Sequence, residues 1–265
     1  MVSIIILNYN TFNLTIKCIR SVFDNTKNVD FEIILVDNAS TECDPEKFLE
    51  EFPGIVLIKN SENRGFSKGC NDGIAKASGK YILLLNSDTI LLNNAIGFCY
   101  DYLNSNPDTG VCTCRIENPD GSPQNNCQRF PSITYPLVER LRLHKIFSKR
   151  KQGKILLGPY FNYSEQTDCD WVWGTFFMFP LKTLELFPEK ILTETFWMYL
   201  EDMEWCKLIS KAGKKICFLP DGRILHFGGN NFEVLNLDNK HRNNFEIFLK
   251  NYYNPLHRFI IRQLS

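Results

Sequence analysis

Polar residues follow three apolar runs near the start of the chain. Asn8 follows SIIIL, Asp37 follows FEIILV, and Asp88 closes the tripeptide NSD that follows YILLL. Each residue alone is explained by turn or helix-cap chemistry, which favours Asp and Asn after strands. Turn chemistry does not require acids at the ends of two strands that flank a third. We therefore interpret Asp37 and Asp88 as carboxylates that an α/β nucleotide-binding half presents to one ligand.

The elements that position these carboxylates alternate between two sequence periods. Four apolar, β-branched runs predict strands covered on both faces, at 3–7, 31–36, 55–58 and 81–85. Three segments with helical periodicity separate them, at 11–25, 44–52 and 65–77. This alternation predicts parallel βαβ units, and with the usual strand order 3-2-1-4 the second and fourth strands flank the first. Their carboxyl ends then open onto one crevice, where such sheets bind ligands.

The second half of the chain has a weaker pattern. The stretch 104–136 is rich in Asn, Pro, Gly and Ser, which predicts loops around short strands. The segment 140–154 holds seven Lys or Arg residues and no acid, so it is either a solvated segment or a surface for anionic lipid or a phosphate-bearing substrate. The segment 170–180 is the most aromatic stretch, and 201–212 predicts a helix closed by Gly213.

The composition is that of an ordinary globular protein, with 265 residues, 44% hydrophobic and 23% charged. Thirty basic residues balance thirty acidic ones, which argues against a nucleic-acid-binding protein. The ten cysteines are scattered and form no C-x-x-C pair, so we expect buried, reduced thiols. We expect no signal peptide, and no apolar run approaches the roughly 20 residues of a membrane span. A cytoplasmic protein is the expectation. No G-x-G-x-x-G follows the first strand, which disfavours a dehydrogenase-type dinucleotide fold.

An ordered set of motifs carries a family resemblance. In the first half the motifs are VSIIILNYN, VDNAS, NRGFSKGCNDGI and GKYILLLNSDT. In the second half they are DWVWGTFFMF, FWMYLEDMEWCKLISKAGKKI and ILHFGG. This set, spread over roughly residues 1–250, resembles the family 2 glycosyltransferases with the GT-A fold, especially bacterial rhamnosyltransferase-like members. The resemblance implies inverting transfer of a sugar from a nucleoside diphosphate sugar to an acceptor hydroxyl.

The resemblance places a donor site in the first half. Asp37 would hydrogen-bond the pyrimidine base, with Asn8 beside it. The loop that opens the third helix, and that helix itself, would complete the nucleotide site with Asn63, Arg64 and Asn71. The donor would be a thymidine or uridine diphosphate sugar (dTDP- or UDP-linked), and rhamnose is a leading candidate for the sugar.

The cofactor that the resemblance implies is a divalent cation. Asp88 would be the metal-binding acid of the family's D-x-D element, and His226 would be a second ligand, although an ordinary hydrogen-bonded histidine is the alternative. The cation would stabilise the negative charge that grows on the departing diphosphate. Carboxylate and diphosphate oxygens suit Mg²⁺ or Mn²⁺, and an imidazole ligand favours Mn²⁺. Asn86 stands where many relatives have the first acid of D-x-D, which predicts weaker metal binding.

The pair Glu201-Asp202 supplies the candidate acids for the transfer. The resemblance makes Asp202 the general base that takes the acceptor's proton, and Glu201 a residue that places the sugar or the acceptor. Such a base typically contributes about 10²- to 10⁴-fold to the rate. The competing interpretation is that Asp202 only caps its helix, whose N-terminus favours an acid. Trp171, Trp173 and Gly174 form a candidate acceptor-binding surface, although such tryptophans are more often core residues.

Three features near the C-terminus leave their roles open. His241, Arg242 and Lys250 either reach the diphosphate or lie on a solvated helix face. The segment 227–231, FGGNN, lacks a serine often found after the histidine of relatives, which leaves the phosphate contacts there open. The segment 252–264 is either a helix packed on the body or an interfacial helix that docks on the inner membrane.

We predict an α/β protein with a mixed central sheet and a GT-A-like βαβ half. Residues 1–95 would bind the nucleotide sugar and residues 96–230 the acceptor, within one domain, and 231–265 would form a helical tail. The predicted function is metal-dependent inverting transfer of rhamnose or another hexose to a growing surface polysaccharide or lipid-linked glycan, in the cytoplasm or at the inner face of the membrane. One alternative is a sugar-nucleotide pyrophosphorylase, disfavoured because no Gly-rich basic loop follows the first strand. The other is a non-catalytic nucleotide-sugar-binding partner of a glycan assembly complex.

Overall fold

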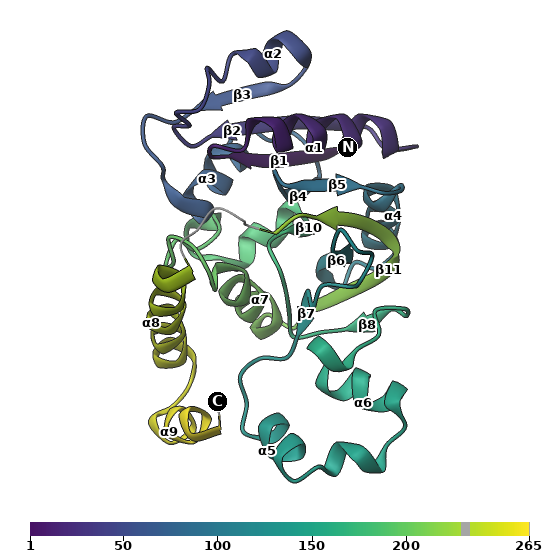
Figure 1. Ribbon diagram of the computed structural model, residues 1–265, viewed down its shortest axis with the longest axis vertical. Coiled ribbons are helices and arrows are strands. Elements are labelled where there is room, and N and C mark those ends of the chain that lie inside the picture. Colours follow the sequence, from purple (N-terminus) through teal and green to yellow (C-terminus); the bar gives the residue numbers. More distant parts are fainter. Residues whose placement is uncertain (229–233, 265) are drawn as a thin grey trace.

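A mixed sheet runs through the molecule in the computed structural model, which describes residues 1–228 and 234–264 (Figure 1). The strands are β1 Val2–Asn8, β2 Phe31–Asp37, β3 Val56–Lys59, β4 Tyr81–Asn86, β5 Thr89–Leu91, β6 Thr109–Glu117, β7 Cys127–Gln128, β8 Thr167–Asp168, β9 Trp171–Val172, β10 Phe176–Pro180 and β11 Lys215–His226. The α-helices are α1 Phe12–Asn25, α2 Lys47–Glu51, α3 Gly65–Ile74, α4 Ala95–Ser105, α5 Thr134–Arg140, α6 Lys149–Leu156, α7 Glu201–Lys211, α8 Val234–Tyr252 and α9 Pro255–Leu264. Short 3₁₀ helices lie at η1 Leu143–Ile146, η2 Gly158–Tyr160, η3 Leu181–Leu186 and η4 Pro188–Lys190.

The first four strands have the predicted order. Within the described residues the main sheet runs β3-β2-β1-β4-β10-β6-β11-β5, and β8 pairs with β11. Strand β1 pairs in parallel with both β2 and β4, so that Asn8 lies opposite Asp37 and Leu7 lies opposite Asn86. The carboxyl ends of these strands therefore meet at one edge of the sheet, which is where α/β sheets bind ligands.

Two apolar cores lie on opposite faces of this sheet because successive side chains of a strand point to opposite faces. On β1, Ile4 and Ile6 join the core beneath α1 and α4, whereas Ile5 joins the core that includes residues of α3 and α7. All three isoleucines are at most 1% exposed, and burial of such a side chain contributes about 1.5–3 kcal/mol. Burial on both faces explains why this strand is a continuous apolar run.

The second half of the sheet corrects one prediction. Residues 109–117, expected to lie among loops and short strands, form the nine-residue strand β6, which is almost wholly buried. Its polar side chains are accommodated by hydrogen bonds: Thr113 Oγ1 donates to the Phe176 carbonyl at 2.8 Å, and Asn126 Nδ2 donates to Thr113 Oγ1 at 3.2 Å. Strand β10 lies antiparallel to both β4 and β6, which makes the sheet mixed, as predicted.

The C-terminal helices pack against the body and lead to the end of the molecule that also carries α5 (Figure 1). Phe248 and Leu249 of α8 are fully buried, and Phe248 packs with Phe196, Leu200 and Met203. All ten cysteines are free and nine are buried, in agreement with the expected core thiols. None of the helices in the described part of the chain is long and apolar enough to cross a membrane.

Candidate functional site

Two adjoining cavities form a cleft at the carboxyl ends of β1 and β4. One, of about 460 Å³, lies beside the first helix and the loop before α3; we call it the donor cavity. The other, of about 540 Å³, lies beside the start of α7; we call it the acceptor cavity. Four residues line both: Phe66, Asn86, Asp88 and Met198. Asp88 therefore stands where the two cavities meet.

Asn8 and Asp37 form a buried pair beneath the donor cavity. Asn8 Nδ2 donates to Asp37 Oδ1 at 2.7 Å, and the Ser40 amide donates to Asp37 Oδ2 at 3.0 Å. Both residues are 1% exposed, and neither lines the cavity, whereas the neighbouring Asn38 does. The structure thus brings the predicted pair together, and the assignment of Asp37 to base recognition stays a prediction.

The three residues predicted around α3 have different positions. Asn63 lines the donor cavity and accepts the Gly65 amide at 3.0 Å. Arg64 pairs with Asp72 at 2.5 Å and does not line the cavity. Asn71 joins α3 to the segment before α7, because its side-chain amide donates to the Leu192 carbonyl at 2.9 Å and accepts the Leu192 amide at 3.1 Å. Only Asn63 is placed to contact a ligand in the donor cavity without rearrangement.

Strand β11 brings His226 to Asp88. The last residues of β11 pair with β5, which places His226 opposite Thr89 and its Nε2 3.3 Å from Asp88 Oδ1. Gln124 orients the His226 ring. The Gln124 side-chain nitrogen Nε2 donates to the His226 carbonyl at 3.0 Å and to Asn118 Oδ1 at 2.9 Å. The Gln124 oxygen Oε1 therefore faces His226 Nδ1, from which it accepts at 2.8 Å. With the hydrogen on Nδ1, the neutral form of the ring has its lone pair on Nε2, on the side of the carboxylate.

This arrangement fits a cation ligand pair. In the neutral form of the ring, Nε2 and the carboxylate oxygen are both acceptors, and a cation between them would satisfy both. The hydrogen bond from Nδ1 to Gln124 is the kind of outer contact that orients metal-ligating histidines. Among the described residues no group of three or more His, Cys, Asp and Glu side chains could hold a metal. Asp88 and His226 would therefore bind Mg²⁺ or Mn²⁺ only together with diphosphate oxygens and water.

The acid pair begins α7 on the wall of the acceptor cavity. Asp202 Oδ2 accepts the Gly174 amide at 3.0 Å, and Oδ1 accepts the Met203 amide at 2.8 Å. Burial raises the pKa of Asp202 to about 6, partly offset by these amides. Burial raises the pKa of Glu201 well above its ordinary value, and the charge of Asp202 raises it further. The Oε2 atom of Glu201 is buried without a hydrogen-bond partner. Asp202 is thus ionised at neutral pH, and its raised pKa makes it basic enough to take a proton. The neighbouring Glu201 holds its proton more readily than Asp202 does.

The aromatic stretch also lines the acceptor cavity. Trp171 and Trp173 line it and are partly buried, and Gly174 brings the backbone beside Asp202. A Cβ atom on Gly174 would lie 3.0 Å from Phe66 Cε1, which is tighter than an ordinary contact. His241 of α8 also lines this cavity. The three predicted acceptor-site residues are therefore brought together with the acid pair.

Other candidates lie elsewhere. Arg242 and Lys250 are exposed on α8 and do not line either cavity. Phe227 and Gly228 line the donor cavity, whereas the rest of the segment FGGNN, residues 229–231, lies outside the described residues. No sequence pattern pointed to Gln124, whose partner His226 lies 102 residues further along the chain.

Gly65 lies at a close contact between α3 and the segment that leads to the acid pair. Its φ is +79°, and a Cβ atom there would lie 2.4 Å from the Trp197 carbonyl oxygen. The next amide, of Phe66, donates to that same oxygen at 2.9 Å. A side chain at this position therefore meets backbone that cannot move without losing a hydrogen bond.

We expect Gly65→Ala to lower the free energy of unfolding by about 1–3 kcal/mol, because the residue would combine a left-handed backbone with a clash. Urea unfolding followed by circular dichroism measures the difference. Gly54→Ala is the matched control, since a Cβ atom there meets nothing within 4 Å. Equal stability of the two variants would contradict the close contact.

The chain belongs to glycosyl transferase family 2, whose family model matches residues 3–202. It is 28% identical over 259 residues to the chondroitin synthase of Pasteurella multocida, an alignment that covers 93% of this chain and 23% of that protein. It is 21% identical over 218 residues to the N-acetylglucosaminyl-diphospho-decaprenol L-rhamnosyltransferase of Mycobacterium tuberculosis, covering 73% of this chain and 66% of that one. The chain spans 15% of an uncharacterized glycosyltransferase of Rickettsia bellii and 50% of the glycosyltransferase GlyG of Streptococcus pneumoniae.

Solved structures share the fold. A crystal structure of GalNAc-T7 with UDP, GalNAc and Mn²⁺ matches with a TM-score of 0.63 at 16% identity, covering 86% of this chain and 44% of that one. The mannosyltransferase PcManGT of Pyrobaculum calidifontis, in complex with GDP-Man and Mn²⁺, matches with a TM-score of 0.59 at 16% identity, covering 87% of this chain and 57% of that one. The predicted family and the predicted GT-A-like mixed α/β fold are confirmed.

Proposed function

We propose that this chain is an inverting glycosyltransferase that uses a nucleoside diphosphate sugar and a divalent cation. The observation that carries the proposal is the position of Asp88, which faces His226 Nε2 at 3.3 Å and lines both the donor and the acceptor cavity. A sugar linked to a diphosphate at Asp88 would present its anomeric carbon at this junction. Asp202, on the wall of the acceptor cavity, would then face the acceptor that attacks it.

The proposed reaction is a single displacement. The acceptor hydroxyl oxygen attacks the anomeric carbon, and the bond from that carbon to the diphosphate oxygen breaks with its electron pair on the diphosphate. Asp202 takes the proton of the hydroxyl, while the Gly174 and Met203 amides hold its two oxygens in place. Asp88 and His226 would hold a cation, whose charge would stabilise the departing diphosphate. Attack from the face opposite the leaving group inverts the anomeric centre.

We propose a pyrimidine nucleoside diphosphate sugar as donor and a surface polysaccharide or lipid-linked glycan as acceptor. Support comes from relatives: one is named a rhamnosyltransferase acting on a diphospho-decaprenol compound, and one structural neighbour was solved with UDP. Thermal shift across UDP-, dTDP- and GDP-linked sugars with Mn²⁺ tests the donor, because a specific donor raises the melting temperature by mass action. A shift with the GDP sugar alone would overturn the pyrimidine assignment.

The pH dependence should report the acid pair. Asp202 must be ionised to act as a base, and its pKa of about 6 predicts that kcat/KM falls about tenfold per pH unit below pH 6 and is constant above about pH 7. The pKa of Asp202 is higher in the folded than in the unfolded chain, so the folded state binds this proton more tightly. Protonation of Asp202 between roughly pH 6 and 4 therefore increases the free energy of unfolding. Kinetics and melting temperatures measured from pH 4.5 to 8 separate the two effects. A constant kcat/KM down to pH 4.5 would contradict the assignment of the base.

We further propose peripheral contact with an anionic membrane, at the end of the molecule that carries α5 and α9 (Figure 1). Tyr253 lies just before α9, and Pro131 lies just before α5. The Tyr253 hydroxyl donates to the Pro131 carbonyl at 2.7 Å, so the two helices start close together. Large apolar side chains are exposed there, at 61–76%: Leu141, Ile146, Leu256 and Phe259. Four exposed basic residues accompany them, Arg140, Arg142, Lys145 and Lys149, together with the partly buried Arg258. Apolar and basic side chains together suit a negatively charged bilayer surface.

We expect the double variant Leu256→Ser/Phe259→Ser to lose most of its co-sedimentation with vesicles of anionic phospholipid, because both exposed apolar side chains would leave the bilayer. Ile247→Ser, which changes an exposed apolar residue of α8, is the control and should sediment like the wild type. Sedimentation of the double variant at the level of the control would overturn the proposed contact.

A further inference from the structure

The segment just before the acid pair contributes to the walls of both cavities. Met198 lines both cavities, and Tyr199 and Leu200 line the acceptor cavity immediately before α7. On its other side the segment is joined to α3, where Phe66 donates to the Trp197 carbonyl at 2.9 Å. Any shift of residues 197–200 therefore changes the shape of the cleft and the position of the acids.

This segment has an unfavourable backbone conformation. Tyr199 and Leu200 have φ values of 72° and 71°, although neither is glycine. A non-glycine residue in this region is strained and persists only where its surroundings hold it. The double left-handed turn directs the chain into α7, so that Glu201 and Asp202 reach the cavity wall. Contacts from elsewhere in the fold must maintain it.

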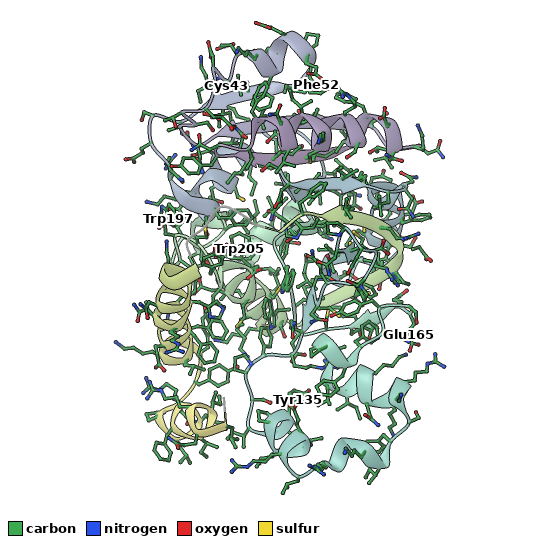
Figure 2. All side chains as sticks on the ribbon, viewed as in Figure 1. Cys43, Phe52, Tyr135, Glu165, Trp197 and Trp205 are labelled. Carbon is green, nitrogen blue, oxygen red and sulfur yellow. The ribbon has the colours of Figure 1, made fainter. Side chains whose placement is uncertain are left out.

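Helix α8 supplies these contacts from one face. Three residues at intervals of four, Lys240, Asn244 and Phe248, point toward the segment, as residues on one stripe of a helix do. The Lys240 ammonium lies 3.7 Å from the centre of the Trp197 ring, and Phe248 packs against Leu200. Figure 2 places Trp197 near the end of α8 that approaches α3.

Asn244 makes the most specific of these contacts. Its Nδ2 donates to the Met198 carbonyl and to the Tyr199 carbonyl, at 2.9 Å each. Both amide hydrogens are thus used on two successive carbonyls of the strained turn. Helix α8 follows the part of the chain that the family model matches, which ends at residue 202, so this contact is a feature of the chain's own C-terminal region.

We propose that Asn244 is a positioning residue for the acid pair: it holds the turn at 198–200 so that Asp202 faces the sugar across the junction of the two cavities. Asn244 does not line either cavity and acts through the backbone of the turn. Its loss should leave the donor cavity able to bind nucleotide and should displace the base. Misplacement of a reacting group by about 1 Å can cost roughly 10²-fold in rate.

The test compares Asn244→Ala and Asn244→Asp with the matched control Asn243→Ala, which changes an exposed asparagine on the same helix. If this chain transfers sugar as proposed, both Asn244 variants should lower kcat about 10- to 100-fold and change KM for the donor by no more than about twofold. Asn244→Asp keeps the size of the side chain but removes the two amide hydrogens. This variant tests the positioning role if Asn244→Ala does not fold. A kcat within about twofold of that of Asn243→Ala would overturn the proposal, as would a loss that lies wholly in KM.

Hydrogen–deuterium exchange tests the same role without an assay of transfer. The amides of Phe66 and Glu204 donate to the Trp197 and Leu200 carbonyls, at 2.9 Å and 3.0 Å, and therefore report the turn from both sides. Both amides should exchange faster in the Asn244 variants than in Asn243→Ala. Unchanged exchange would overturn the positioning role. If no donor is turned over by the wild type, the proposed function fails, and the exchange result still decides whether Asn244 holds the turn.

Discussion

Replacement of Asp202 by Asn is expected to lower kcat about 10²- to 10⁴-fold while donor binding is retained. The substitution removes the carboxylate that would take the acceptor's proton, whereas Asp88 and the donor cavity are unchanged. Side-chain size is also preserved. The measurement is steady-state turnover of the donor together with calorimetric binding of the matching nucleoside diphosphate in the presence of Mn²⁺.

The control for this prediction is Asp170→Asn. Asp170 also accepts a backbone amide, that of Phe130 at 2.9 Å, but it does not line the acceptor cavity. The Asp170→Asn variant should have a lower free energy of unfolding without a comparable loss of kcat. If Asp202→Asn retained near-normal turnover, or if both variants lost turnover equally, Asp202 would be a helix-capping residue and not the base.

Replacement of Asp88 by Ala is expected to lower turnover about 10²- to 10³-fold and to remove the part of nucleotide binding that depends on a divalent cation. The reason is its position, since it faces His226 Nε2 at 3.3 Å where the two cavities meet. Titration of UDP and dTDP with and without Mn²⁺ measures the cation-dependent part of the affinity.

Asn86→Asp is the reciprocal variant. Asn86 lines both cavities beside Asp88, and a second carboxylate there should strengthen cation binding. Opposite changes in the two variants would locate the cation at this junction. Nucleotide affinity that is independent of Mn²⁺ in the wild type and in both variants would contradict a metal site formed by Asp88 and His226.

Local sequence pattern was sufficient to predict the first half of the fold. The four apolar runs form β1 to β4 with boundaries within one or two residues of those expected, because strands buried on both faces need continuous apolar sequence. The order 3-2-1-4, taken as the usual one for such units, is the observed order, and it brings Asn8, Asp37 and Asp88 to one edge. Strand β6 was missed because Thr113 and other polar residues are buried in it, where hydrogen bonds with distant residues compensate.

The finer geometry of the site depends on contacts between distant segments. Gln124 lies in a stretch whose composition predicts loops, and its role exists only because β11 brings His226 to it. Asn244 is one of several polar residues on α8, and nothing nearby in sequence distinguishes it from Asn243. The burial of Asp37 with both oxygens engaged likewise depends on Asn8 and Ser40. Residue types could be predicted, whereas their orientation could not.

The central claim is that Asp88 and Asp202 act on one sugar donor from two sides of the junction. The most direct measurement is NMR of the purified protein with diamagnetic Mg²⁺ and each pyrimidine nucleoside diphosphate sugar in turn, with water as the acceptor. We expect release of nucleoside diphosphate and of free sugar with the inverted anomeric configuration, both lost in Asp202→Asn and in Asp88→Ala. Nucleotide binding without turnover of any donor, or release of sugar with the retained configuration, would contradict the claim.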